Sequence, residues 1–193
     1  MNAMVSIVSH PGLWFFLAAA VVPFLKGRAL KWLLPVPAVL AILAVLLLRH
    51  GTGLNFSYLG VDLTMLRVDQ LSVIFSHVFA IQALLGFIYA LHVRDKGQHV
   101  AAFLYVGGAM GCVFAGDYLT LFVFWELMAV ASTFLVWLNR NPTSTRAGFH
   151  YFLFHTAGGL VLLFGILLRW IDLDTFAFIP TDPGSMQLYD YLI

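Results

Sequence analysis

Six long apolar runs occupy most of this chain and leave it few folds to adopt. A helix that spans a bilayer needs about 20 predominantly apolar residues, and most of the runs approach that length. Of the 193 residues, 62% are hydrophobic and only 10% are charged. This composition predicts an all-α integral membrane protein with about six transmembrane helices. The expected spans are Pro11 to Leu25, Leu30 to Leu48, Leu71 to Leu91, Val100 to Ala115, Leu119 to Trp137 and Ala147 to Leu168.

The charged residues between the runs predict the orientation of these spans. Three alternate connections carry the basic residues Lys26, Arg28, Lys31, Arg94, Lys96, Arg140 and Arg146. Basic loops stay on the cytoplasmic side, so we expect a multi-pass protein of the cell membrane with its N-terminus on the outer side. Arg49 and Arg67 lie on the opposite side and weaken this contrast.

Two segments on the expected outer side are too polar to span. Residues 51–70 mix turn residues with short apolar stretches, which favours a short hairpin or an interfacial helix. The last residues, Leu188 to Ile193, restart an apolar pattern. We therefore interpret residues 1–178 as a six-helix transmembrane domain and residues 179–193 as a tail that begins a further helix. Such a restart is expected in a piece of a larger polypeptide, or where a partner subunit covers this end.

Several classes of function have no support in the sequence. Cys112 is the single cysteine and belongs to no CxxC motif, so we predict no metal site and no cofactor in this chain. The sequences typical of ATP hydrolysis, metalloproteases and serine esterases are absent. The basic residues are scattered and the net charge is +1, which gives no indication of nucleic acid. The expected surroundings are the lipid bilayer and other membrane subunits.

Glu126 is the residue that most strongly suggests a function. It is the only charged residue between Tyr118 and Trp137, and it lies near the middle of its span. An ionised carboxylate at that depth costs on the order of 3 kcal/mol or more to insert, so an intramembrane acid indicates proton or ion handling. The alternative is a permanently protonated side chain that hydrogen-bonds a neighbouring helix.

Histidines on the sixth span are the candidate partners of Glu126. His150 and His155 are about 140° apart around a helix, so only one of them is expected to face it. A helix that begins at Ala147 places His155 nearer the depth of Glu126, whereas an N-cap at Thr143 or Ser144 makes His150 comparable. Both therefore stay candidates for a proton relay. His77 in the third span is either a further relay member or a packing residue.

Other polar and small residues have structural interpretations. Asp117 precedes the fifth span and is expected to cap it. Gly107 and Gly111 form a GxxxG pair that predicts close backbone packing between helices. Bis-histidine haem binding by a membrane anchor is a further alternative, but it leaves Glu126 without a role.

The run DYLTLFVFWELMAVASTFLVW at Asp117 to Trp137, with an acid after Phe-Trp, resembles the fifth helix of antiporter-like subunits. These subunits occur in respiratory complex I, membrane-bound hydrogenases and Mrp-type cation/proton antiporters. The stretch from Ala147 to Ile166 is similar to the helix that follows in this family, and Leu66 to Phe75 to the start of its third helix. Among the subgroups, the D-type subunit of Mrp antiporters is the most similar.

The resemblance implies a fold of about fourteen helices, with a glutamate and a series of lysines or histidines that pass protons. Glu126 matches the family glutamate, and His150 falls where many members carry Lys or Arg. The family's central lysine would lie beyond Ile193, so this chain is expected to supply only the first part of a proton path. The resemblance thus predicts a transporter subunit that exchanges protons for sodium or potassium, or part of a proton-pumping NADH:quinone oxidoreductase. The alternative is a truncated or split assembly subunit that transports nothing.

Overall fold

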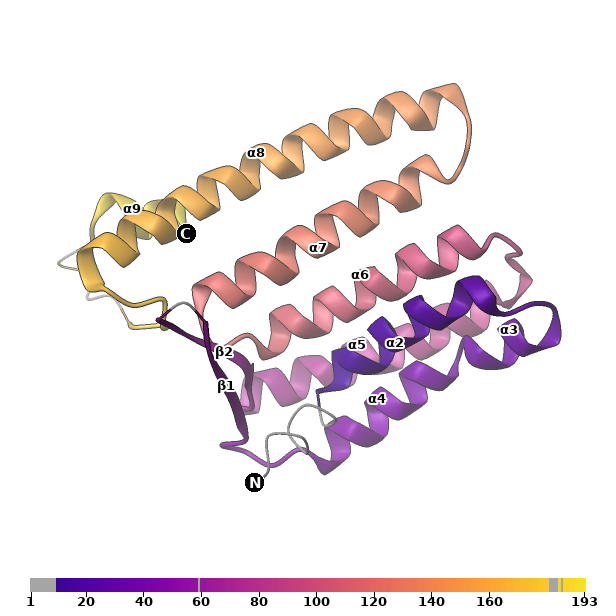
Figure 1. The fold of residues 1–193 in the computed structure, drawn as a ribbon, viewed down its shortest axis with the longest axis horizontal. Coiled ribbons are helices and arrows are strands. Elements are labelled where there is room, and N and C mark those ends of the chain that lie inside the picture. The colour runs from indigo at the N-terminus through magenta and orange to yellow at the C-terminus, as the bar shows by residue number, and fades with distance from the viewer. Residues whose placement is uncertain (1–9, 59, 181–183, 185) are drawn as a thin grey trace.

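The computed structural model describes residues 10–58, 60–180, 184 and 186–193, and these form a bundle of helices with a small hairpin at one end (Figure 1). In chain order the elements are α2 (Pro11–Val21), η1 (Val22–Phe24), α3 (Arg28–Leu33), α4 (Val36–Leu47), β1 (Gly53–Tyr58), β2 (Val61–Arg67), α5 (Gln70–Tyr89), η2 (Ala90–His92), α6 (Lys96–Phe114), α7 (Tyr118–Trp137), α8 (Pro142–Leu173) and α9 (Leu188–Leu192).

The described chain contains five segments that are long and apolar enough to cross a membrane, and a shorter apolar helix precedes them. The five are Arg28–Leu47, Gln70–His92, Lys96–Phe114, Tyr118–Trp137 and Pro142–Leu173, and the shorter one is Pro11–Phe24. All six correspond to predicted spans. The chain is therefore a multi-pass membrane protein of the predicted class.

Two spans differ from their predicted course near their polar ends. The second is divided into α3 and α4 at Pro35, which caps α4, and Pro37 follows in its first turn. Proline has no amide hydrogen to continue the bonds of the preceding helix. The fourth begins at Lys96 instead of Val100, because the carboxylate of Asp95 accepts the amide hydrogen of Gly97 at 2.8 Å.

The sixth span is longer than predicted at both ends. Its N-cap is Asn141, whose Oδ1 accepts the amide hydrogen of Ser144 at 2.7 Å. Pro142 then occupies the first helical position, where its missing amide hydrogen does no harm. The predicted starts at Thr143, Ser144 or Ala147 were wrong, because they placed the cap after the proline instead of before it. This earlier start moves both histidines of α8 further from the N-terminal end of the helix.

Aromatic rings fill the centre of the bundle around α2. Phe15 lies 6.3 Å from Phe87 and 6.4 Å from Phe103, and the last two stack at 4.2 Å between ring centroids. The glycine pair Gly107 and Gly111 of α6 makes room for aromatic rings of the neighbouring helices. A Cβ at Gly107 would meet the ring of Phe16, and one at Gly111 would meet the ring of Phe124. A Cβ on Gly12 of α2 would lie 3.0 Å from the backbone oxygen of Gly107, so close backbone packing is present at Gly107, whereas an aromatic ring faces Gly111.

At the end opposite the α7–α8 turn, one carboxylate joins the hairpin to α7. The strands β1 and β2 pair antiparallel, which confirms the hairpin among the alternatives for this segment. Asp117 is buried and caps α7 as predicted, since it accepts the amide hydrogen of Thr120 at 2.7 Å. It also accepts the hydroxyl of Thr120 at 2.8 Å and the amide hydrogen of Thr64 in β2 at 2.5 Å. The amide hydrogen of Tyr118 reaches the carbonyl of Phe176, which follows α8, at 3.0 Å.

We expect Asp117→Ala to destabilise the protein by about 3 kcal/mol, because it leaves buried amide and hydroxyl donors without an acceptor. Thermal unfolding of the purified protein in detergent would measure the loss. Asp62→Ala is the matched control, since Asp62 is exposed on the same hairpin. A melting temperature that falls equally in both variants would contradict the structural role of Asp117.

The C-terminal residues fold back onto the end of α8. Arg169 is only 2% exposed and pairs with Asp190 of α9 at 2.8 Å. Its guanidinium also donates to the carbonyl of Ile179 at 2.7 Å and lies 5.4 Å from the centre of the Tyr118 ring. Residues far apart in the sequence thus close this end of the bundle.

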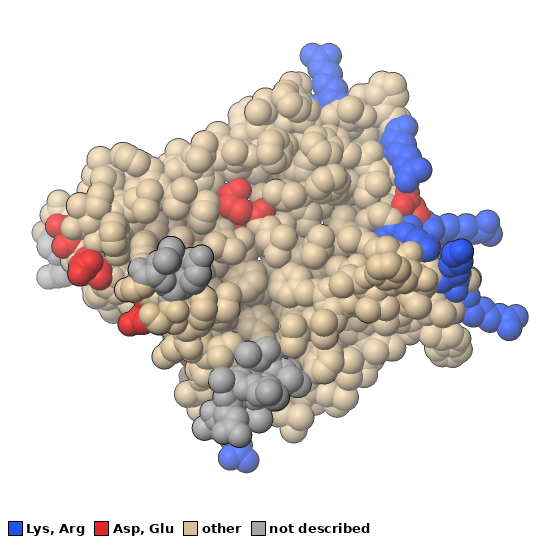
Figure 2. Space-filling view, viewed as in Figure 1, with Lys and Arg blue, Asp and Glu red and all other residues tan. Residues whose placement is uncertain are grey.

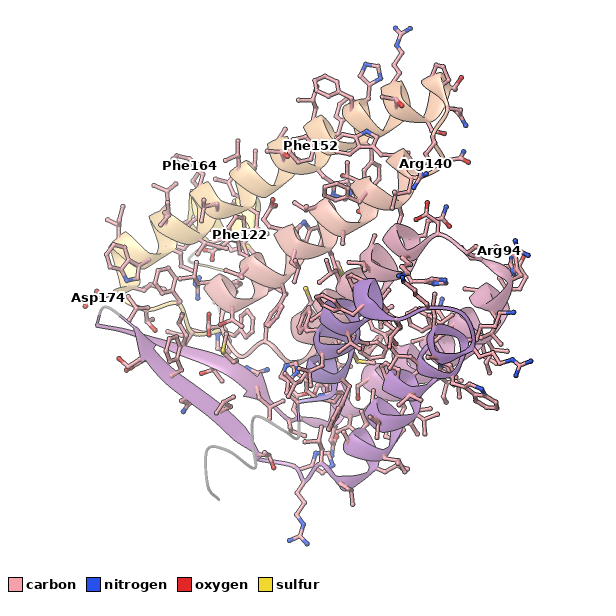
Figure 3. All side chains as sticks on the ribbon, turned by 45° about the vertical axis from the view of Figure 1, so that its right-hand side comes forward. Arg94, Phe122, Arg140, Phe152, Phe164 and Asp174 are labelled. Carbon is pink, nitrogen blue, oxygen red and sulfur yellow. The ribbon has the colours of Figure 1, made fainter. Side chains whose placement is uncertain are left out.

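Charge is segregated between the two ends of the bundle. Most Lys and Arg side chains gather at one end, and the broad face between the ends is largely uncharged (Figure 2). Arg94 and Arg140 lie at that basic end, whereas Asp174 lies at the other (Figure 3). The basic connections predicted to share one side of the membrane therefore do share one end of the molecule.

Candidate functional site

The candidate site lies where α7 and α8 pack together midway along their length. Glu126 is the ninth residue of α7, about 12 Å from the start of that helix. It is the only glutamate in the chain, and its side chain is partly buried. Among the described residues, its buried Oε1 has no hydrogen-bond partner. A buried polar atom without a partner is costly, so this oxygen is the unusual feature of the helix pair.

A glycine on α8 makes room for the carboxylate. Gly159 is buried, and a Cβ built on it would overlap Oε1 of Glu126. The neighbouring Gly158 is exposed and has nothing within 4 Å of the same hypothetical atom. The carboxylate therefore occupies a notch in α8 that exists only because residue 159 has no side chain.

His155 shares this face of α8. It lies four residues before Gly159, which places both on one side of the helix. The imidazole is partly buried and lies close enough to Glu126 for the two side chains to interact electrostatically. Of the two histidines predicted as relay partners, the structure brings His155 to the acid.

His150 lies apart from this pair. Its side chain is exposed, and it lines a shallow surface hollow together with Pro142, Thr143, Arg146 and Ala147. The start of α8 at Pro142 moves His150 deeper than a start at Ala147 would, but the residue of α8 that meets Glu126 is Gly159, nine residues further on. Position and exposure both separate it from Glu126.

Two hydroxyl groups extend the site toward the basic end. The ring of Tyr151 lies 4.3 Å from the ring of His155, between centroids. Its hydroxyl donates to Oγ of Ser132 on α7 at 3.1 Å, and Ser132 in turn donates to the carbonyl of Ala129 at 2.9 Å. These contacts fix the rotation of α8 against α7 one turn away from His155.

Close packing at the basic end holds the same register. A Cβ on Gly148 would meet the indole of Trp137, and the indole nitrogen donates to the carbonyl of Thr145 at 3.2 Å. The helical spacing of Gly148, Tyr151, His155 and Gly159 keeps all four on the side of α8 that faces α7.

The sequence prediction missed some of these residues. Gly159 was not among the predicted site residues, although its place four residues after His155 in HTAGG is a signal that links the two. Tyr151 and Ser132 carried no comparable signal, because a lone hydroxyl in an apolar run is common.

His77, the other histidine considered for the relay, is placed on α5, where its Nδ1 lies 2.7 Å from the carbonyl of Val73. That contact is within the helix and gives His77 no link to Glu126.

Similarity to known proteins supports the predicted family. Residues 115–176, which contain Glu126 and His155, match the model of the NADH:quinone oxidoreductase/Mrp antiporter transmembrane family. A curated protein of Staphylococcus aureus (strain MRSA252), provisionally named antiporter subunit mnhA2, is 28% identical over 157 residues. That alignment covers 76% of this chain but 19% of the relative, so the chain spans about a fifth of the relative's length. The D-type assignment stays a prediction.

Solved structures share the fold. The Mrp complex from Dietzia sp. DQ12-45-1b aligns with a TM-score of 0.76 and 23% identity, over 96% of this chain and 22% of that one. An archaeal membrane-bound sulfane sulfur reductase aligns at 0.78 and 21%, over 88% and 28%. Complex I from Thermus thermophilus aligns at 0.72 and 19%, over 96% and 41%. The matched segment and the shared fold support an antiporter-like membrane protein, similar to the subunits of Mrp antiporters and NADH:quinone oxidoreductases.

Proposed function

We propose that this chain carries a proton-transfer site of a multisubunit membrane complex, either a cation/proton antiporter or a complex I-like oxidoreductase. In this proposal Glu126 gains and loses a proton in exchange with His155. The single observation that carries it is the Glu126 carboxylate, whose Oε1 is buried in the notch at Gly159 without a hydrogen-bond partner among the described residues.

The chemistry of that oxygen favours exchange over a static role. A carboxylate inside a membrane is stabilised by a proton, by a cation or by hydrogen-bond donors. A permanently protonated acid in a packing role would be expected to hydrogen-bond the neighbouring helix, but none of the residues that the structure describes forms such a bond with the buried oxygen. Histidine titrates near neutral pH, and His155 is the histidine on the face of α8 that packs against Glu126.

The wider path is proposed from the family resemblance. A cation from another helix or subunit would bias the charge of Glu126, as the central lysine does in the family. We also propose that the basic end of the bundle faces the cytoplasm, because the positive-inside rule favours it. Any redox chemistry of the parent complex would belong to other subunits.

The two histidines provide the test. In the assembled parent complex, we expect His155→Gln to lower proton-coupled cation transport about 10- to 100-fold and to flatten its pH profile near neutrality. Transport would be measured in inverted membrane vesicles with a pH-sensitive dye across several pH values.

His150→Gln makes the same chemical change at an exposed position and should retain most of the transport. If His150→Gln alone abolishes transport, or if the pH profile of His155→Gln matches the wild type, the proposed pair is wrong. Assembly of the complex, checked by co-purification, separates a transport defect from a folding defect.

A further inference from the structure

A second feature of the molecule, separate from the Glu126 site, is an apolar groove between α6 and α7. Its volume is about 510 Å³, and it is open along one side. Its walls include Val100 and Leu104 of α6 and Val130, Phe134 and Leu138 of α7. Val130 is 40% exposed and Phe134 48% exposed, so this lining faces the surroundings of the bundle.

The groove has a charge at one end only. Lys96 is the single charged residue among its described lining residues, and it is the first residue of α6, at the basic end. From Lys96 to Leu104 the helix rises about 12 Å. One leaflet of the hydrocarbon core is about 15 Å thick. The groove therefore extends from the level of the lipid headgroups through most of one leaflet.

The ammonium group of Lys96 has capacity for a ligand. Its Nζ donates one hydrogen bond, to the carbonyl of Pro23 at 2.9 Å, and an ammonium carries three donors. The neighbouring carboxylate of Asp95 pairs with Arg140 at 2.6 Å. Among the described residues, no carboxylate forms an ion pair with Lys96, so positive charge predominates at this mouth of the groove.

We propose that the groove binds an anionic phospholipid, with its phosphate at Lys96 and one acyl chain along α6 and α7. The charge at the mouth fits a phosphate, and the uncharged walls fit a hydrocarbon chain over one leaflet. A transmembrane helix of a partner is a poorer match, because such helices pack on small residues. Here Ala101 and Ala131 are buried in the lining, and the exposed side chains that a partner would meet include the branched Val130 and the aromatic Phe134.

Lipid retention by the intact protein tests the proposal. The full-length parent complex would be placed in nanodiscs of equal phosphatidylglycerol and phosphatidylcholine, purified again in detergent, and its retained lipids measured by mass spectrometry. We expect phosphatidylglycerol to be enriched over phosphatidylcholine, and Lys96→Gln to lower this enrichment about fivefold. Lys96→Arg keeps the charge and should keep the enrichment.

Lys31→Gln is the matched control, because Lys31 is exposed on α3 and does not line the groove. Equal retention of the two lipids by the wild type would overturn the proposal, as would equal losses in Lys31→Gln and Lys96→Gln. A photoreactive side chain at Val130 identifies the occupant directly. Cross-linking to phosphatidylglycerol supports the site, whereas cross-linking to a protein chain shows that a partner helix occupies it.

Discussion

Glu126→Gln should reduce proton-coupled transport by the assembled complex about 100-fold or more, because the amide cannot take up or release a proton at any physiological pH. The amide has almost the shape of the carboxyl group, so it can occupy the notch at Gly159 without overlap. The complex is therefore expected to assemble normally and to lose only its transport. Dye-based measurements of proton movement in vesicles, driven by a sodium or potassium gradient, would quantify the loss.

Glu126→Asp is the informative companion variant. It keeps a titratable carboxyl group but withdraws it from the notch by one methylene, so it should retain more transport than Glu126→Gln. Transport at the wild-type level in Glu126→Gln would show that the acid is a packing residue, and the chain would then fit the non-transporting assembly role.

Gly159→Ala should lower transport about 10-fold or more, although it changes no polar group. The added Cβ would occupy the position of Oε1 of Glu126, so the carboxylate must move away from α8 and from His155. Misplacement of a reacting group by about 1 Å can cost up to 100-fold in rate. Transport assays on the same vesicles, with expression levels matched, measure this effect.

Gly158→Ala is the control for this change, because a Cβ at Gly158 meets nothing within 4 Å. It adds the same methyl group and the same helix propensity one residue away. If both glycine variants lose transport equally, the notch has no specific role. The double variant Gly159→Ala, Glu126→Asp adds a sharper comparison, because the shorter acid relieves the overlap. We expect it to transport better than Gly159→Ala alone, which would show that the two positions are coupled.

The sequence predicted the class of fold and singled out Glu126 as a candidate from features of single segments. Apolar runs near 20 residues require helices in a bilayer, and Glu126 is conspicuous because its run has no other charge. The choice between His150 and His155 was not local. It depended on the register and rotation of α8 against α7, which set Gly159 and the helix face of His155 against Glu126.

Other parts of the site could not be predicted because they depend on contacts between helices. Neither the Tyr151 to Ser132 hydrogen bond nor the fit of Glu126 against Gly159 follows from either helix alone. The same limit applies to the glycines of α6. A GxxxG pair predicts a smooth face, but whether a backbone or an aromatic ring fills it depends on the neighbouring helix. Here the rings of Phe16 and Phe124 meet it, and the backbone of α2 also approaches Gly107 at Gly12.

The length of α8 has a consequence for the membrane around the site. Its 32 residues rise about 48 Å, whereas the hydrocarbon core is about 30 Å thick. The helix must therefore tilt or project into the headgroup layers, and the thickness of the bilayer acts on its angle. Contacts with α7 at Gly148, Tyr151 and Gly159 resist that tilt. A change in bilayer thickness is thus expected to change the tilt of α8 and, with it, the position of the notch that holds Glu126.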